Sequence, residues 1–109
     1  MPVFKSVPVV KTINGFTAKT SNYAIVIKDT YTTSGENAII VKDIPNCTIT
    51  LDSKTTDHIT IKSLTDTLIV SDFPIDDFFD EIELRDNASI ELIFVKDAWY
   101  ILSSDGLKT

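Results

Sequence analysis

The sequence is poor in several residue types, and each shortage excludes a class of protein. A single cysteine, Cys47, in 109 residues excludes an internal disulfide framework and a cysteine-based zinc site. Three glycines exclude a collagen-like repeat, and five alanines with no glutamine make a helical bundle a poor match. Apolar runs are too short for a signal peptide or a membrane-spanning helix, so we expect a soluble chain made in the cytoplasm.

Basic residues are scarce relative to acidic ones. Ten Lys and Arg residues face 16 Asp and Glu residues, which gives a formal net charge of −6. This balance disfavours nucleic acid as a partner, because non-specific binding needs Lys and Arg to neutralise phosphates. The acids comprise 12 Asp and 4 Glu, and Asp favours turns and strand ends over helices.

β-Branched residues are abundant instead. Ile, Val and Thr supply 37 of the 109 residues, and these side chains fit a pleated sheet better than a helix. From residue 23 onward, apolar and polar residues alternate in short segments bounded by Asp, Asn, Ser and Gly, which is the pattern of half-buried strands. The predicted strands lie within Tyr23–Thr30, Glu36–Ile44, Cys47–Ser53, His58–Ser63, Thr67–Asp72, Glu81–Asp86, Ser89–Val95 and Ala98–Ser104.

The spacing of these segments predicts the fold class. Strands recur every eight to ten residues, so we expect an all-β domain, a short-stranded antiparallel sandwich or β-prism. One segment, Phe73–Ile82, interrupts the pattern. Its apolar residues Ile75, Phe78, Phe79 and Ile82 are spaced as on one helical face, which predicts a turn of helix or a large loop there.

The predicted strands also suggest an assembly. Each strand offers only two or three inward apolar side chains, and one thin sheet of this length cannot bury both its ends and its edges well. Three copies stacked around an axis would cover them, so we predict an intertwined homotrimer, with a self-contained sandwich as the alternative. The side chains predicted to form the core or trimer interface are Ile49, Leu51, Ile59, Ile61, Leu68, Val70, Ile90, Leu92 and Trp99.

The first twenty residues differ from the rest of the chain. Pro2 and Pro8 fit only strand edges or extended segments, and alternation is weak. We therefore divide the chain into an extended N-terminal arm, residues 1–20, and a β domain, residues 21–109. The arm is interpreted either as an edge strand or as an anchor on another protein. The anchoring side chains would be Val3, Phe4, Val7, Val9 and Val10.

Two residues with reactive side chains lack the surroundings that catalysis needs. His58 follows Asp57 where a turn enters a strand, and no nucleophile accompanies it in a readable pattern, so an exposed turn histidine is expected. Cys47 opens an alternating strand with Ile49 and Leu51, which predicts a buried structural thiol.

An acidic stretch and an aromatic pair offer the remaining chemistry. The acidic stretch lies within residues 76–83. Carboxylates bind hard cations such as Ca²⁺ and act in glycoside hydrolases, but the spacing here is not that of a calcium loop. We interpret the stretch as a solvated loop around Phe78 and Phe79. Alternation places Trp99 and Tyr100 on opposite faces, so Trp99 is expected in the core or an interface, with a sugar-stacking platform as the alternative. The acidic residues are Asp76, Asp77, Asp80, Glu81 and Glu83.

The order of these elements resembles a β domain common in bacteriophage fibre and virion-surface proteins. That domain runs from a Thr-Ile-Thr-Leu-like strand through an Ile-x-Ile-Lys strand, a Val-x-Ile strand and an Ile-Asp-Gly turn to a closing pair that resembles Ala-Ser-Val-x-Leu-Val and Asp-x-x-Trp-Tyr-Val. Here a further two residues, Phe78 and Phe79, follow the turn, and Asp77 replaces its glycine. The matching residues are Ile49, Thr50, Leu51, Ile59, Ile61, Lys62, Leu68, Val70, Ile75, Asp76, Ala88, Ser89, Ile90, Leu92, Asp97, Trp99 and Tyr100.

The resemblance implies a trimeric, non-enzymatic module of a virus particle, made in the host cytoplasm and located on the virion. The chain's length favours a capsid decoration or head-fibre protein over a long tail fibre. The partners expected are further copies of the chain, the major capsid protein and, in one alternative, a host surface glycan bound by a small tail fibre. No cofactor, metal, nucleic acid or membrane is expected, and a glycan-active enzyme using residues 76–83 is the least favoured alternative.

Overall fold

The computed structural model describes residues 22–107 together with the strand residues 3–5, 11–13 and 16–18. These residues form strands and turns without a helix, and so provide no helix that could cross a membrane. The predicted all-β class is confirmed. The strands are β1 (Val3–Lys5), β2 (Lys11–Ile13), β3 (Phe16–Ala18), β4 (Tyr23–Val26), β5 (Thr30–Thr32), β6 (Ala38–Val41), β7 (Asn46–Leu51), β8 (His58–Ser63), β9 (Asp66–Ile75), β10 (Phe79–Phe94) and β11 (Trp99–Leu107).

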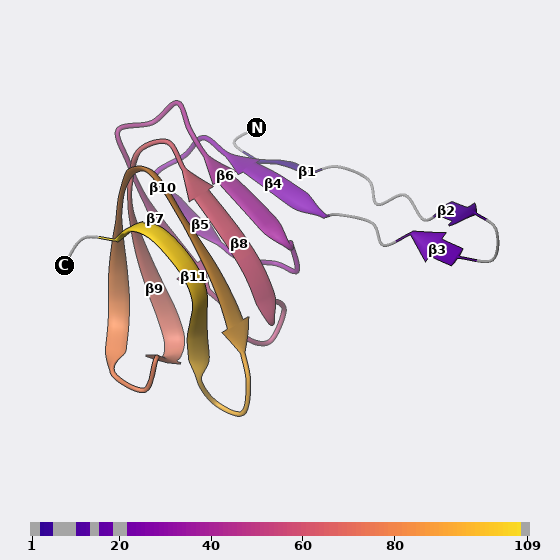
Figure 1. Cartoon of the computed structure of the whole chain (residues 1–109). Coiled ribbons are helices and arrows are strands. Elements are labelled where there is room, and N and C mark those ends of the chain that lie inside the picture. The colour runs from indigo at the N-terminus through magenta and orange to yellow at the C-terminus, as the bar shows by residue number, and fades with distance from the viewer. Residues whose placement is uncertain (1–2, 6–10, 14–15, 19–21, 108–109) are drawn as a thin grey trace.

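The chain winds between two layers in a solenoid-like stack (Figure 1). Strands β4, β6 and β8 pair in parallel and form one layer. Strands β5, β7 and β9 pair in parallel and form the other layer. The chain therefore visits the layers alternately, and each passage adds a strand beside the previous one. The predicted antiparallel pairing is wrong for the pairings among these six strands, because a winding chain brings strands of the same direction together.

A long hairpin closes the end of the stack. The first half of β10 pairs antiparallel with β9 and its second half with β8, so this strand spans both layers. Strand β11 pairs antiparallel with β10. Between the two halves, Asn87 has a φ of 63°, a left-handed conformation that Asn tolerates better than most residues. Strands β1 and β4–β11 together form a nine-stranded sheet. Strand β1, which pairs with β4, lies at one edge, and β5 lies at the other.

Gly106 allows β11 to lie against this bend of β10. Its φ is 93°, and an added Cβ would lie 2.7 Å from the Cβ of Ala88. Both the backbone conformation and the close approach therefore require a residue without a side chain.

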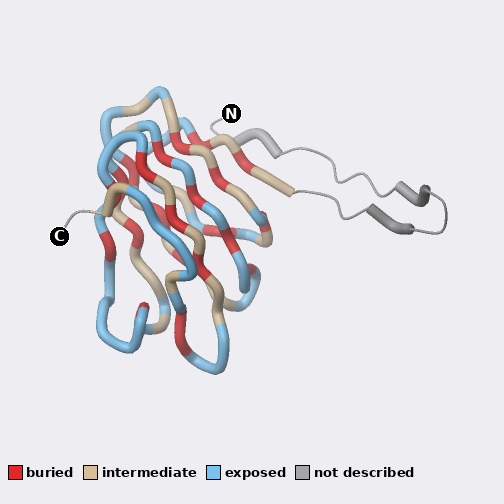
Figure 2. Tube along the Cα trace, in the orientation of Figure 1, coloured by how far each residue is buried: buried red, intermediate tan, exposed pale blue. Residues whose placement is uncertain are grey.

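The core lies between the two layers, and alternate residues along β4, β6, β7, β8 and parts of β9 and β10 enter it (Figure 2). Seven of the predicted core or interface side chains are buried within a single copy, at 0–1% exposure. The premise that one copy cannot cover its inward apolar side chains is therefore wrong for these seven residues. Each layer covers the inward face of the other, so these side chains are not available for contacts between copies. They are Ile49, Leu51, Ile59, Ile61, Ile90, Leu92 and Trp99.

The predicted register of one strand is wrong. Leu68 and Val70 of β9 are only partly buried and face outward, whereas Ile69 between them is fully buried. In the uninterrupted apolar run Leu-Ile-Val, either the middle residue or the two outer residues could face the core. Pairing with the neighbouring strand decides between these two orientations. Ile69 pairs with Ile49 of β7, whose side chain already points into the core.

The predicted helical turn within Phe73–Ile82 is also wrong. Strand β9 continues to Ile75, and β10 begins at Phe79 after a three-residue turn. Asp76 and Asp77 have φ values of 52° and 60° in this turn, and the left-handed conformation reverses the chain without a helix.

The described part of the N-terminal arm is extended. Val3 and Phe4 lie in β1, which occupies a sheet edge. Strands β2 and β3 pair antiparallel in a separate two-stranded sheet, with Ile13 opposite Phe16. The predicted anchoring residues Val7, Val9 and Val10 lie outside the described residues.

Candidate functional site

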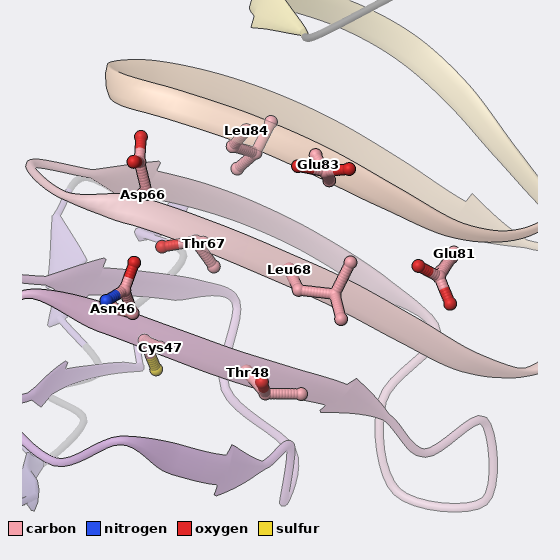
Figure 3. A pocket seen from close by; sticks show the side chains of 9 residues that line it. All are labelled: Asn46, Cys47, Thr48, Asp66, Thr67, Leu68, Glu81, Glu83 and Leu84. Atoms are coloured by element: carbon pink, nitrogen blue, oxygen red, sulfur yellow. The ribbon is translucent and has the colours of Figure 1, made fainter.

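A groove of about 280 Å³ crosses the outer side of the layer formed by β7, β9 and β10 (Figure 3). The strand register assembles it: Thr48 lies opposite Leu68, and Leu68 opposite Glu83. Side chains far apart in the sequence thus share one outward row. The groove is lined by Asn46, Cys47, Thr48, Asp66, Thr67, Leu68, Glu81, Glu83 and Leu84.

The groove is suited to binding a polar ligand. The amide of Asn46, the hydroxyl of Thr48 and the carboxylates of Glu81 and Glu83 can form hydrogen bonds with a ligand, beside the apolar side chain of Leu68. Carboxylates accept hydrogen bonds from hydroxyl groups, which makes a polyhydroxylated ligand a chemical match. Among the described residues, no group of three or more His, Cys, Asp or Glu side chains could hold a metal ion.

Cys47 contributes no nucleophile to the groove. Its side chain is 3% exposed, as the alternating pattern predicts. Burial, and then the negative charge of Asp29, raise the pKa of the Cys47 thiol to about 11. The thiol is therefore protonated at neutral pH and has little thiolate character.

His58 lies on the other layer, at the start of β8. Its Nε2 atom lies 2.7 Å from Oε2 of Glu91, and the Ser103 hydroxyl donates a hydrogen bond of 3.3 Å to Oε1 of the same carboxylate. The serine therefore contacts the acid and not the imidazole, so the three groups lack the order of a nucleophilic triad. The imidazole is exposed, as the sequence predicts, but its partner is 33 positions away and cannot be found from local spacing.

The acidic stretch 76–83 divides between two places. The amide of Asp76 donates a 2.8 Å hydrogen bond to the Trp99 carbonyl, and its Oδ1 accepts a 3.0 Å bond from the amide of Ile101. These bonds fix the β9–β10 turn to β11. Farther along β10, Glu81 and Glu83 line the groove.

Trp99 is buried and cannot form a sugar-stacking platform. Its ring packs 5.3 Å from that of Phe94, and its Nε1 donates a 3.2 Å hydrogen bond to Asp72. Burial acts to raise the pKa of Asp72, but hydrogen bonds from the hydroxyl and amide of Ser53 and from the Trp99 indole outweigh it. The pKa of this carboxyl therefore lies below its ordinary value.

The described residues thus combine a polar groove on one layer, a His58–Glu91 pair on the other layer and a buried thiol. The predicted site residues that the structure brings together are those of the core. The groove was not predicted, because it depends on which residues of β7, β9 and β10 become neighbours. The sequence matches no model of a known protein family, and no curated protein matches it.

Proposed function

We propose that this chain is a non-enzymatic structural component of a bacteriophage particle, a capsid decoration or head-fibre protein. In this proposal residues 1–20 bind the virion and the β domain projects from it. The observation that carries the proposal is the order of elements that resembles phage virion-surface domains. In the structure these elements are β7, β8, β9, β10 and β11, which belong to one continuous sheet.

The architecture suits a structural role. Stacked strands share main-chain hydrogen bonds from one passage to the next, and the core between the layers is fully enclosed in each copy. Strand β1, which belongs to residues 1–20, pairs with β4, so the proposed anchor would leave from one edge of this sheet.

The partners in this proposal are two further copies of the chain and the major capsid protein. Because the predicted interface side chains are covered within one copy, a homotrimer would form through outward side chains. Light scattering during size-exclusion chromatography should give a mass of about three times 12.1 kDa. A stable monomer at high concentration would remove the trimer from the proposal.

The virion location is tested on particles. Mass spectrometry and immunogold labelling of phage particles, purified from the host that produces this chain, should detect it on the particle surface. Replacing Val7, Val9 and Val10 together with Asp in the full-length chain should abolish incorporation, because charges prevent an apolar anchor from docking. Thr60→Asp, on the outward side of β8, is the matched control and should leave incorporation unchanged. Absence of the chain from purified particles would refute the proposal.

The groove favours a second candidate, a receptor- or carbohydrate-binding module of a small tail fibre. Its carboxylates and amide match the hydroxyl groups of a glycan. Reproducible binding on a glycan array that is lost on joint Glu81→Gln and Glu83→Gln substitution would support it. Asp105→Asn, an exposed acid on β11 outside the groove, serves as the control. Binding that is absent, or that survives the double substitution, would exclude this groove as the receptor site.

A further inference from the structure

The β9–β10 turn exposes two aromatic rings in a fixed position. We define the aromatic tip as residues 76–81. Within it, the Phe78 side chain is 80% exposed and that of Phe79 is 45% exposed, and the two rings pack edge to face at 5.0 Å. The hydrogen bonds of Asp76 to β11 fix the turn. A fixed, exposed pair of large apolar side chains is typical of a contact surface.

The charge around the aromatic tip indicates the kind of surface that it fits. Residues 72–83, at the end of β9, the turn and the start of β10, contain six acidic residues and no Lys or Arg, whereas residues 1–71 contain seven basic and six acidic residues. The negative charge of the chain is thus concentrated in the segment that carries the tip. A partner surface should therefore combine apolar side chains with basic ones.

The other layer of the same chain carries such a surface. Ile25, Ile40 and Lys62 lie opposite one another on the outward side of β4, β6 and β8. Two positions farther along lie Ile27, Lys42 and Leu64, and backbone hydrogen bonds from the amides of Lys42 and Leu64 to the preceding strands keep them stacked. The side chains of Ile27 and Leu64 are 44% and 45% exposed. We call these six residues the basic apolar patch.

These two surfaces cannot meet within one copy. Strands β4, β6 and β8 all end at the top of the molecule in Figure 1, whereas the β9–β10 turn lies at the bottom. Of the large apolar side chains that the described part of the chain exposes, four belong to these two surfaces: Ile27, Leu64, Phe78 and Phe79. Each surface is therefore positioned to be covered by another molecule.

We propose that the aromatic tip of one copy docks on the basic apolar patch of a second copy. Phe78 and Phe79 would cover Ile27 and Leu64. The carboxylates around them would approach Lys42 and Lys62, which within the chain contact the Asp43 carboxylate at 3.9 Å and the Asn87 carbonyl at 3.0 Å. Because the two surfaces differ, the contact is head to tail, and three repetitions around an axis close a ring. This inference rests on the homotrimer of the proposed function and names the surfaces that form it.

The test measures self-association of the full-length chain by light scattering over a range of concentrations. Joint Phe78→Ser and Phe79→Ser substitution should weaken association by about tenfold or more, because it removes the buried aromatic contact. Leu102→Ser, at a side chain that is 53% exposed and outside both surfaces, is the matched control. Circular dichroism and the unfolding temperature verify that each variant is folded.

Charge reversal provides the decisive experiment. Joint Lys42→Glu and Lys62→Glu should weaken association, and joint Asp80→Lys and Glu81→Lys should do so too. Combining all four substitutions should restore it, because the attraction is then reinstated with reversed signs. Added salt should weaken the wild-type contact.

The outcomes separate the inference from the proposals on which it rests. Two results would refute this docking while leaving the trimer in place. In one, the trimer persists after the aromatic substitutions. In the other, each charge reversal disrupts the trimer and the combined variant does not restore it. A wild-type chain that stays monomeric at all concentrations would refute both the docking and the trimer. The virion location would then still be decided by the composition of the particles.

Discussion

Strand β9 could place either Leu68 or Ile69 in the core, and the two orientations predict different losses of stability when each residue is replaced. In the structure Ile69 is fully buried and Leu68 faces the groove. Replacing Ile69 with Ala removes three buried carbon atoms and leaves a cavity between the layers, at a cost of about 2–5 kcal/mol. Leu68→Ala removes the same number of carbon atoms from a partly exposed side chain and should cost less than about 1 kcal/mol.

The assay is urea unfolding followed by circular dichroism, with thermal unfolding as a second measurement. The midpoint for Ile69→Ala should fall by about 1 M urea or more, since a domain of this size loses roughly 1–3 kcal/mol of stability per molar urea. Its unfolding temperature should fall by roughly 10 °C or more. Leu68→Ala should unfold close to the wild type. If Leu68→Ala were the more damaging substitution, the orientation of β9 and the outer wall of the groove would both be wrong.

Four further predictions follow from particular contacts. Ile61→Asp should prevent folding by burying an unpaired charge, whereas Thr60→Asp should be mild; equal loss of circular dichroism signal would contradict the orientation of β8. Gly106→Ala should lower the unfolding temperature by several degrees because of its positive φ and the 2.7 Å clash, and an unchanged temperature would argue against this bend. The lowered pKa of Asp72 stabilises the fold above the unfolded-state pKa of about 3.9, and this contribution is lost as pH falls through the folded-state value. Asp72→Asn should therefore flatten the dependence of unfolding temperature on pH below about 5. If the variant and the wild type lost the same amount of unfolding temperature in acid, the lowered pKa of Asp72 would be contradicted. Cys47, with a pKa of about 11, should react slowly with a thiol reagent at pH 7.5 when folded and rapidly in urea; fast labelling of the folded chain would refute its burial.

The candidate site shows where sequence reasoning succeeded and where it could not. The burial of Cys47 followed from alternation along its strand, and the exposure of His58 followed from its place where a turn enters a strand. The groove could not be predicted, since it exists only when Thr48, Leu68 and Glu83 become cross-strand neighbours. The bond of Asp72 with the Trp99 indole joins residues 27 positions apart and has no local signal.

The sequence by itself determined the strand content and most of the inward side chains, because alternation along a strand is a local property of the chain. Ile49, Ile59 and Ile90 could thus be assigned to a core from their immediate neighbours. Tertiary structure decided how the strands pair, since parallel winding and antiparallel pairing use the same alternating segments. It also decided what covers the core. Two layers of one winding chain face each other, so apolar faces that look insufficient strand by strand are enclosed within a single copy.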